Sequence, residues 1–310
     1  MSALAFTLLA LLFAGPAPEL LARATWPMRA PRAAVVLWQA IALAAVLSAF
    51  SAGLAIGSRL LVPGPDGRPT ATLTSEIRAL GWPLWVAYVV ALGLTLLVGA
   101  RLALAVLQVA VATRRRRAYH RMVVDLVGVH RDCVGQGDVR VLHVAEPLAY
   151  CLPGVRSRVV VSDGALNRLS DLEVAAVLRH ERAHLRARHD LVLEMFTAVH
   201  AAFPRFVRSA SALDAVTLLV ELLADDAAVR VTGPSPLARA LVACAWGPAP
   251  SGALAAGGTS TVVRVRRLAG GGNSLLLGVG AYLAAAAVLF VPTVAVAVPW
   301  LTELHRLFAV

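Results

Sequence analysis

Two histidines and a glutamate lie close together in the segment LRHERAHLRARHD at residues 178–190. Three residues separate His180 from His184, and Glu181 lies between them. On a helix this spacing puts both imidazoles on one face, one turn apart, where they can bind the same metal ion. Glu181 then projects beside them, toward the position that catalytic zinc keeps open for water. The triplet is short enough to arise by chance, so it predicts a hydrolytic zinc site only in a suitable context.

A third ligand is expected, because catalytic zinc sites hold the metal through three protein ligands. The segment VELLADD at residues 220–226 supplies a candidate, since Glu221 and Asp225 are four residues apart and share one helix face. We expect Glu221 to bind the metal. Asp225 would accept a hydrogen bond from the second ring nitrogen of a ligand histidine and so fix its orientation. Without the histidines, the same pair would indicate only a solvated helix face.

The helices that must position these residues have clear boundaries. Ser170 and Glu173 form a predicted capping box, and Leu169 can pack on Val174, so the first motif is expected on a helix that begins there. A second helix is predicted at about residues 212–231, where it ends at a Thr-Gly-Pro sequence. Both motifs are therefore predicted to be helical.

A small sheet is predicted before the first motif, from runs rich in β-branched residues at 139–144 and 155–161. Its second run is expected to hold an extended peptide substrate by edge pairing. The residues expected to do so are Arg158, Val159, Val160 and Val161. Residues 191–207 are read as a membrane-hugging or core helix, and a third short helix is expected at 236–246. Residues 247–259 are read as a flexible linker, because they are rich in Gly, Pro, Ala and Ser.

The rest of the chain is too apolar for a soluble protein. Of its 310 residues, 59% are hydrophobic and 15% are charged, whereas about a quarter are charged in a typical soluble domain. Apolar runs at 3–22, 33–58, 82–112 and 275–301 are each long enough to cross about 30 Å of hydrocarbon. A cleaved signal peptide is a weaker explanation of the first run, because no basic residue precedes it. The predicted fold class is mostly α: a four-span helical membrane protein with a cytoplasmic α+β zincin-like metalloprotease domain.

The runs divide the chain into three predicted parts. Residues 1–117 hold three transmembrane helices, 118–273 the metalloprotease domain, and 274–310 the fourth helix and a short tail. Arginines follow the first and third runs, including RRRR at 114–117, so the domain is predicted to be cytoplasmic and both termini outside. The net charge of +11 is assigned to this anchoring and to anionic headgroups, not to direct nucleic-acid binding. The three cysteines have no CxxC spacing, so neither a disulfide framework nor a cysteine metal site is predicted.

The segments RHERAHLRARHD, FPRF and VELLADD together resemble the BlaR/MecR-type integral-membrane metallopeptidases. CLPGVRSRVVVSDGAL is similar to the segment that precedes the motif in the related HtpX and CAAX-processing zinc proteases. The resemblance implies one zinc ion per chain bound by His180, His184 and Glu221, with Glu181 as catalytic base and Asp225 behind the ligands. The antibiotic sensors of that family continue into an extracellular penicillin-binding domain, whereas this chain ends soon after its fourth run, so direct β-lactam sensing is not expected.

The leading hypothesis is a zinc endopeptidase of the cell membrane that cleaves a cytoplasmic protein or peptide, such as a winged-helix repressor, or itself within residues 247–272. The alternatives are an HtpX-like quality-control protease and a non-enzymatic membrane receptor or scaffold. The lipid bilayer is the other expected partner. The sequence leaves open the substrate, the inducing signal and whether a homodimer forms. The remaining histidines are expected to be structural or on the surface, and only Arg230 and Arg239 are suggested as oxyanion stabilisers.

Overall fold

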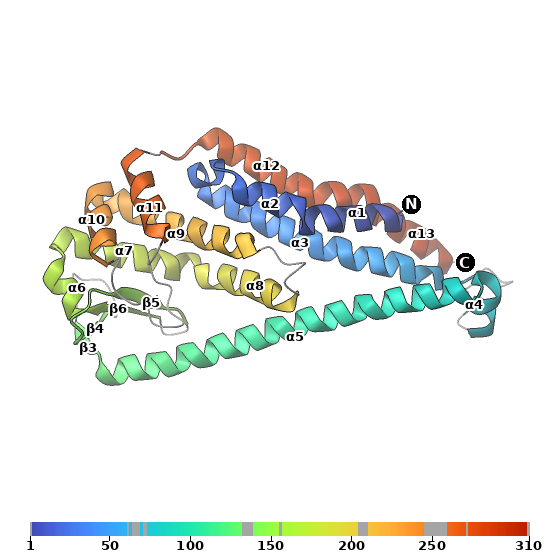
Figure 1. Ribbon diagram of the computed structural model, residues 1–310, viewed down its shortest axis with the longest axis horizontal. Helices are drawn as coiled ribbons and strands as arrows, with labels where there is room; N and C mark the ends of the chain where they lie inside the picture. Colours follow the sequence, from blue (N-terminus) through green and yellow to red (C-terminus); the bar gives the residue numbers. More distant parts are fainter. Residues whose placement is uncertain are drawn as a thin grey trace.

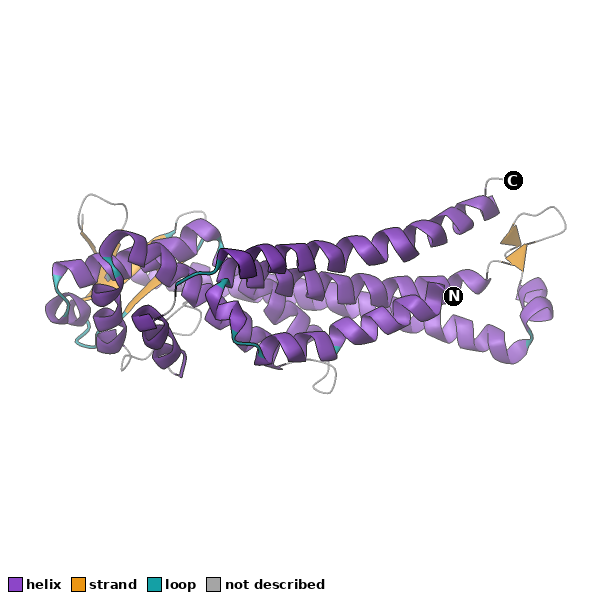
Figure 2. Cartoon of the chain, turned by 90° about the horizontal axis from the view of Figure 1, so that it is seen from above, coloured by secondary structure: helices purple, strands orange, loops and turns teal. Residues whose placement is uncertain are grey.

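The computed structural model of the chain describes residues 2–60, 62–63, 69–70, 73–131, 139–154, 157–203, 210–244, 259–270 and 272–308. Long helices run beside one another along most of the molecule, and a four-stranded sheet lies at one end of them (Figure 1). Both ends of the chain lie at the opposite end from this sheet. Figure 2 shows the same separation from above, with a small strand pair near the termini.

The apolar bundle consists of α1 (Ser2–Ala14), α2 (Pro16–Arg23), α3 (Pro31–Gly57), α5 (Trp82–Val127), α12 (Leu275–Pro292) and α13 (Val298–Phe308). Short elements join them: η1 (Trp26–Arg29), η2 (Ser58–Leu60), β1 (Val62–Pro63), β2 (Pro69–Thr70), α4 (Leu73–Leu80) and the π-helical η3 (Thr293–Ala297). Four helical stretches are long and apolar enough to cross a membrane, namely Ser2–Arg23, Pro31–Leu60, Trp82–Val127 and Leu275–Thr302. They match the four apolar runs that the sequence predicts.

The second part of the chain holds the strands β3 (Val129–Arg131), β4 (Val139–Leu142), β5 (Ala149–Leu152) and β6 (Arg158–Ser162). Its helices are α6 (Asp163–Arg168), α7 (Asp171–Ala187), α8 (His189–Ala202), α9 (Ala210–Thr232), α10 (Pro234–Cys244) and α11 (Thr259–Gly270). The predicted helices at 212–231 and 236–246 correspond to α9 and α10. Strands β3 and β5 and helices α6 and α11 are not predicted from the sequence.

Strand β6 lies inside the sheet, whose order is β3-β4-β6-β5. It pairs in parallel with β4 on one side and antiparallel with β5 on the other, so its backbone groups on both sides are engaged. The prediction that Arg158, Val159, Val160 and Val161 form an edge for substrate pairing is therefore wrong. The outer strand on this side is β5, which packs against α7.

The two parts of the chain share one hydrophobic core. Trp38 and Ile41 of α3 pack in the same buried cluster as Val220 and Leu222 of α9 and Phe196 of α8. Helix α5 also runs without a break across the predicted boundary at residues 117 and 118. The helices that carry the motif residues are thus packed directly onto the apolar bundle.

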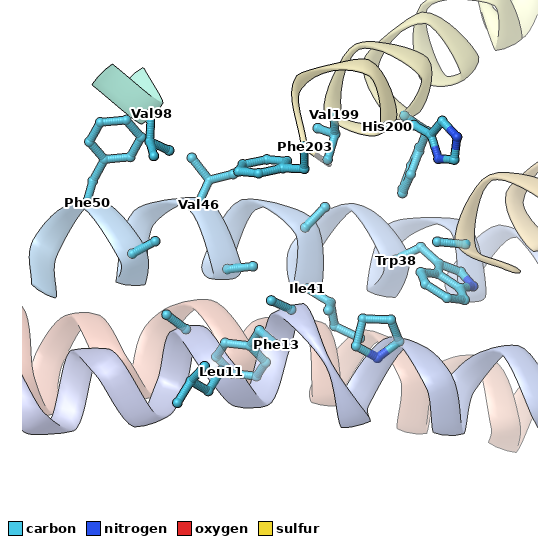
Figure 3. Close-up of a pocket in the computed structure, with 18 of the residues that line it drawn as sticks. Leu11, Phe13, Trp38, Ile41, Val46, Phe50, Val98, Val199, His200 and Phe203 are labelled. Atoms are coloured by element: carbon cyan, nitrogen blue, oxygen red, sulfur yellow. The ribbon is translucent and has the colours of Figure 1, made fainter. Parts of the chain in front are cut away.

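A half-open apolar pocket of about 400 Å³ lies between the helices of the bundle (Figure 3). Phe13 of α1, Trp38 and Phe50 of α3, and Val199 of α8 line it, together with Val98 of α5. Helix α8 contributes to the lining and buries Phe196, Ala198 and Ala202, which agrees with the core alternative of the predicted membrane-hugging or core helix at 191–207. Residues 204–209, which include most of the FPRF segment, lie outside the described residues.

Candidate metal centre

Helix α7 begins with the predicted capping box. The backbone N–H of Ser170 donates to the Glu173 carboxylate at 2.9 Å, and the Ser170 side chain accepts in return from the backbone of Glu173. From this start, the helical period places His180 and His184 on one face. Both imidazoles are buried, and their Nε2 atoms lie 3.2 Å apart.

Helix α9 brings Glu221 to the two histidines. Its Oε1 atom lies 3.5 Å from His184 Nε2, and its Oε2 atom lies 3.4 Å from His180 Nε2. The three candidate ligand atoms all lie within 4.8 Å of one another. One turn further along α9, Asp225 places Oδ1 3.0 Å from His180 Nδ1. The four residues that the two motifs single out as ligands and support are therefore brought together where α7 and α9 meet.

The residues present fit a metal ion. Two imidazoles and one carboxylate make up the three-ligand set of a catalytic zinc site, which keeps one coordination position open. Glu181 is buried beside them, and its Oε2 atom has no hydrogen-bond partner among the described residues. A buried carboxylate oxygen without a partner is costly unless it serves a purpose, and a water next to a metal would supply the missing donor.

Burial tunes the protonation of Glu181. It raises the pKa of this carboxyl to about 7, close to the value that suits a group taking and returning a proton at neutral pH. Cys151 of β5 interacts with the Glu181 carboxylate, and burial raises the pKa of its thiol far above the usual range. The thiol therefore stays protonated and can donate to Glu181.

The pKa values of the two candidate histidine ligands are shifted in opposite directions. Burial lowers the pKa of His184 to about 3, so its imidazole is neutral at pH 7 and can offer a lone pair. Burial also acts to lower the pKa of His180, but contacts with Asp225 and Glu221 outweigh it and raise that pKa to about 9. Burial disfavours ionised Glu221, yet the contact with His180 and the nearby positive charges hold its pKa below its usual range. Glu221 is therefore ionised, as a metal ligand must be.

Arg264 of α11 also lies at the centre, and no pattern in the sequence predicts it. Its side chain is fully buried, and its Nε and Nη2 atoms donate to Asp225 Oδ2 and Oδ1 at 2.8 and 2.6 Å. Its Nη1 atom lies 2.9 Å from Glu221 Oε2. Residues 259–270, which belong to the predicted self-cleavage region 247–272, form this helix. Residues 245–258 and 271 lie outside the described residues.

The sequence predicts His189 to be a structural or surface histidine. It is buried, and its Nδ1 atom lies 3.1 Å from His184 Nδ1, so it supports a candidate ligand from behind. The turn that brings it there is made by Arg188, whose backbone is left-handed with φ 51°. Asp190, which follows His189, pairs with Arg117 of α5 at 3.0 Å.

Neither arginine suggested as an oxyanion stabiliser lies at the centre. Arg239 pairs with Glu173 at the first turn of α7, away from the histidines, and Arg230 is exposed. Both suggestions are therefore unsupported. The buried arginine beside the ligands is Arg264.

Comparison with known proteins gives one family. No curated protein matches the chain. A crystal structure of Ste24p from S. mikatae is similar with a TM-score of 0.37 and 13% sequence identity, over 86% of this chain and 96% of that one. The model of peptidase family M48 matches residues 111–268. This range includes α7 with His180 and His184, and α9 with Glu221 and Asp225. The chain belongs to peptidase family M48, a family of metalloproteases.

Proposed function

We propose that this chain is an integral-membrane zinc endopeptidase, with His180, His184 and Glu221 as ligands of one zinc ion and Glu181 as catalytic base. The observation that carries the proposal is the buried cluster of three ligand atoms within 4.8 Å, with the unpartnered Glu181 oxygen next to it. Such a combination is costly to maintain in a protein that does not use it. It therefore favours an enzyme over a receptor or scaffold.

The residues of the centre divide the work of hydrolysis. A zinc ion held there would polarise the scissile carbonyl and make water a better nucleophile. Glu181 takes the proton of the attacking water at Oε2 and later gives it to the leaving amine, which its pKa of about 7 permits in both directions. Asp225 and His189 hold His180 and His184 through the ring nitrogens that face away from the cluster.

The substrate is proposed to be a protein or peptide bound in an extended conformation. Strand β5 is the outermost strand of the sheet on the side of α7, and no described strand pairs with its free edge. An added peptide strand there would lie beside Glu181, because Cys151 of β5 interacts with that carboxylate.

The proposed substrate is a regulatory protein. The resemblance to BlaR/MecR-type metallopeptidases supports cleavage of a cytoplasmic repressor, or of the chain itself, by a cytoplasmic domain. The position of both termini at the far end of the bundle is compatible with this topology (Figure 1). Degradation of damaged membrane proteins, as in HtpX-like proteases, is the competing outcome. A neighbouring gene for a winged-helix repressor, and loss of that repressor in wild-type cells only, would favour regulation.

The decisive variant is Glu181→Gln. Glu181 is not itself a ligand, so the variant should keep about one zinc per chain while proteolysis falls by at least about 100-fold. Zinc content and the rate of substrate loss, or of self-cleavage, are measured on the same preparations. Asp171→Asn, the same chemical change at an exposed position of α7, serves as the control and should retain activity. Equal processing by wild type and Glu181→Gln would show that peptide hydrolysis is not the function.

A further inference from the structure

Arg264 is the only fully buried arginine in the described part of the chain, and it contacts two carboxylates of the metal centre at once. A guanidinium is rarely buried unless all its charge is paired. Here the guanidinium makes two contacts with Asp225 and one with Glu221, and another side chain could hardly reproduce all three. Simple helix packing does not require such a residue, because its neighbours Val265 and Leu268 already pack α11 onto α10.

We propose that Arg264 is a positioning residue of the metal centre, which sets the orientation of one ligand, Glu221, and of the residue that supports another, Asp225. The inference rests on the proposed function, since it assumes that Glu221 and His180 bind a metal ion. It goes beyond the ligand set by assigning α11 a part in metal affinity.

The contact with Glu221 restricts its carboxylate. Arg264 Nη1 lies 2.9 Å from Oε2, while Oε1 faces His184 Nε2 at 3.5 Å. With Oε2 engaged by a guanidinium, rotation of the carboxylate group is hindered, and Oε1 is kept toward His184.

The contact with Asp225 acts on the other side of the centre. Arg264 donates to both oxygens of Asp225, so the plane of that carboxylate is fixed. Asp225 Oδ1 in turn lies 3.0 Å from His180 Nδ1. Arg264 thus determines how His180 presents Nε2 to the cluster, through one intermediate residue.

Arg267, one turn further along α11, provides a matched control. It binds Asp226, the residue next to Asp225, at 2.7 Å, and also the backbone carbonyl of Met28. It therefore ties the same helix to α9 with the same kind of ion pair. It makes no contact with Glu221, Asp225 or either histidine among those the structure describes.

The test compares full-length protein, purified in detergent, as wild type, Arg264→Lys, Arg264→Gln and Arg267→Gln. Zinc affinity is measured by competition with a chelator, and the visible absorption of the cobalt-substituted protein reports the coordination geometry. Removing the support behind a metal ligand typically weakens metal binding by about 10- to 100-fold. We expect a loss of that size and an altered cobalt spectrum for both Arg264 variants. Arg267→Gln should keep zinc affinity within about twofold and leave the spectrum unchanged.

The variants separate positioning from general stability. A merely structural role would lower the stability of Arg264→Lys without changing the cobalt spectrum of the folded fraction. Arg264→Lys keeps the buried positive charge but not the two-pronged geometry, so it carries the test if Arg264→Gln does not fold. Wild-type zinc affinity and spectrum in Arg264→Lys would overturn the inference while leaving the proposed function intact. A wild-type protein without zinc would overturn both.

Discussion

At the scale of single residues, the metal centre combines groups whose roles differ although their types repeat. His180 and His184 are both buried imidazoles, yet the first faces Asp225 and the second faces His189. Glu181 and Glu221 are both buried carboxylates, yet only Glu221 is paired with a guanidinium. These surroundings, more than the residue types, separate a ligand from a proton-transfer group.

Changing His184 to Ala tests the ligand set directly. The variant leaves only two ligands, and a two-ligand remnant holds zinc far more weakly, so zinc should fall from about one per chain to near zero. Metal content is measured on purified, folded protein. His143→Ala, which removes an exposed histidine paired with Asp163, should keep its zinc. Full zinc in His184→Ala would mean that the metal, if present, is held elsewhere.

The residues found from the sequence are those whose signal is local. His180, Glu181 and His184 lie within one helical turn and a half, and the capping box that starts their helix is a four-residue pattern. Arg264 has no such signal. It follows a segment rich in Gly, Pro, Ala and Ser, and its contacts are with Asp225, 39 residues distant in sequence, and with Glu221, which is still further away. Its burial depends on tertiary packing, which one sequence does not reveal.

At the scale of elements, strands with a clear local sequence pattern are also predicted, whereas short strands without one are not. The runs at 139–144 and 155–161 were found because they are rich in β-branched residues. β5 was missed, since Ala149–Leu152 is short and follows a proline, and without it β6 was taken for an edge. The run RRRR predicts only membrane anchoring, but in the structure its last residue, Arg117, links α5 to α8.

Arg117 should matter far more than its neighbours in that run. Its Nη1 atom lies 3.0 Å from Asp190 Oδ2 and 2.6 Å from Glu194 Oε1, and its side chain is 13% exposed. Arg117→Gln removes the charge that pairs α5 with α8 and leaves Asp190 buried, so it should lower the free energy of unfolding by about 3 kcal/mol. Denaturant unfolding in detergent measures this. Arg115→Gln, an exposed member of the run, should change stability by less than about 0.5 kcal/mol.

At the scale of the whole molecule, the helices of the metal centre pack against the apolar bundle and do not form a separate domain. α9 carries Glu221 and also packs on α3, and Asp226 is linked through Arg267 to the carbonyl of Met28 between the first two apolar stretches. Asn273, which precedes α12, donates to the same Asp226 at 2.9 Å. A shift between these long helices would therefore reach α9 through packed contacts and fixed ion pairs.

The arginines of the chain predict its orientation in the membrane. RRRR at 114–117 follows the apolar run at 82–112 and lies on the side of the metal centre, so this end is expected in the cytoplasm. A reporter inserted at residue 252 should then report cytoplasm, and one fused after Val310 should report the outside. A third reporter at residue 66, between α3 and α5, is the internal control and should agree with the one after Val310. An N-terminal tag retained in the mature protein would exclude a cleaved signal peptide. The reverse pattern at all three positions would place the metal centre on the outer face, where it has no access to a cytoplasmic repressor.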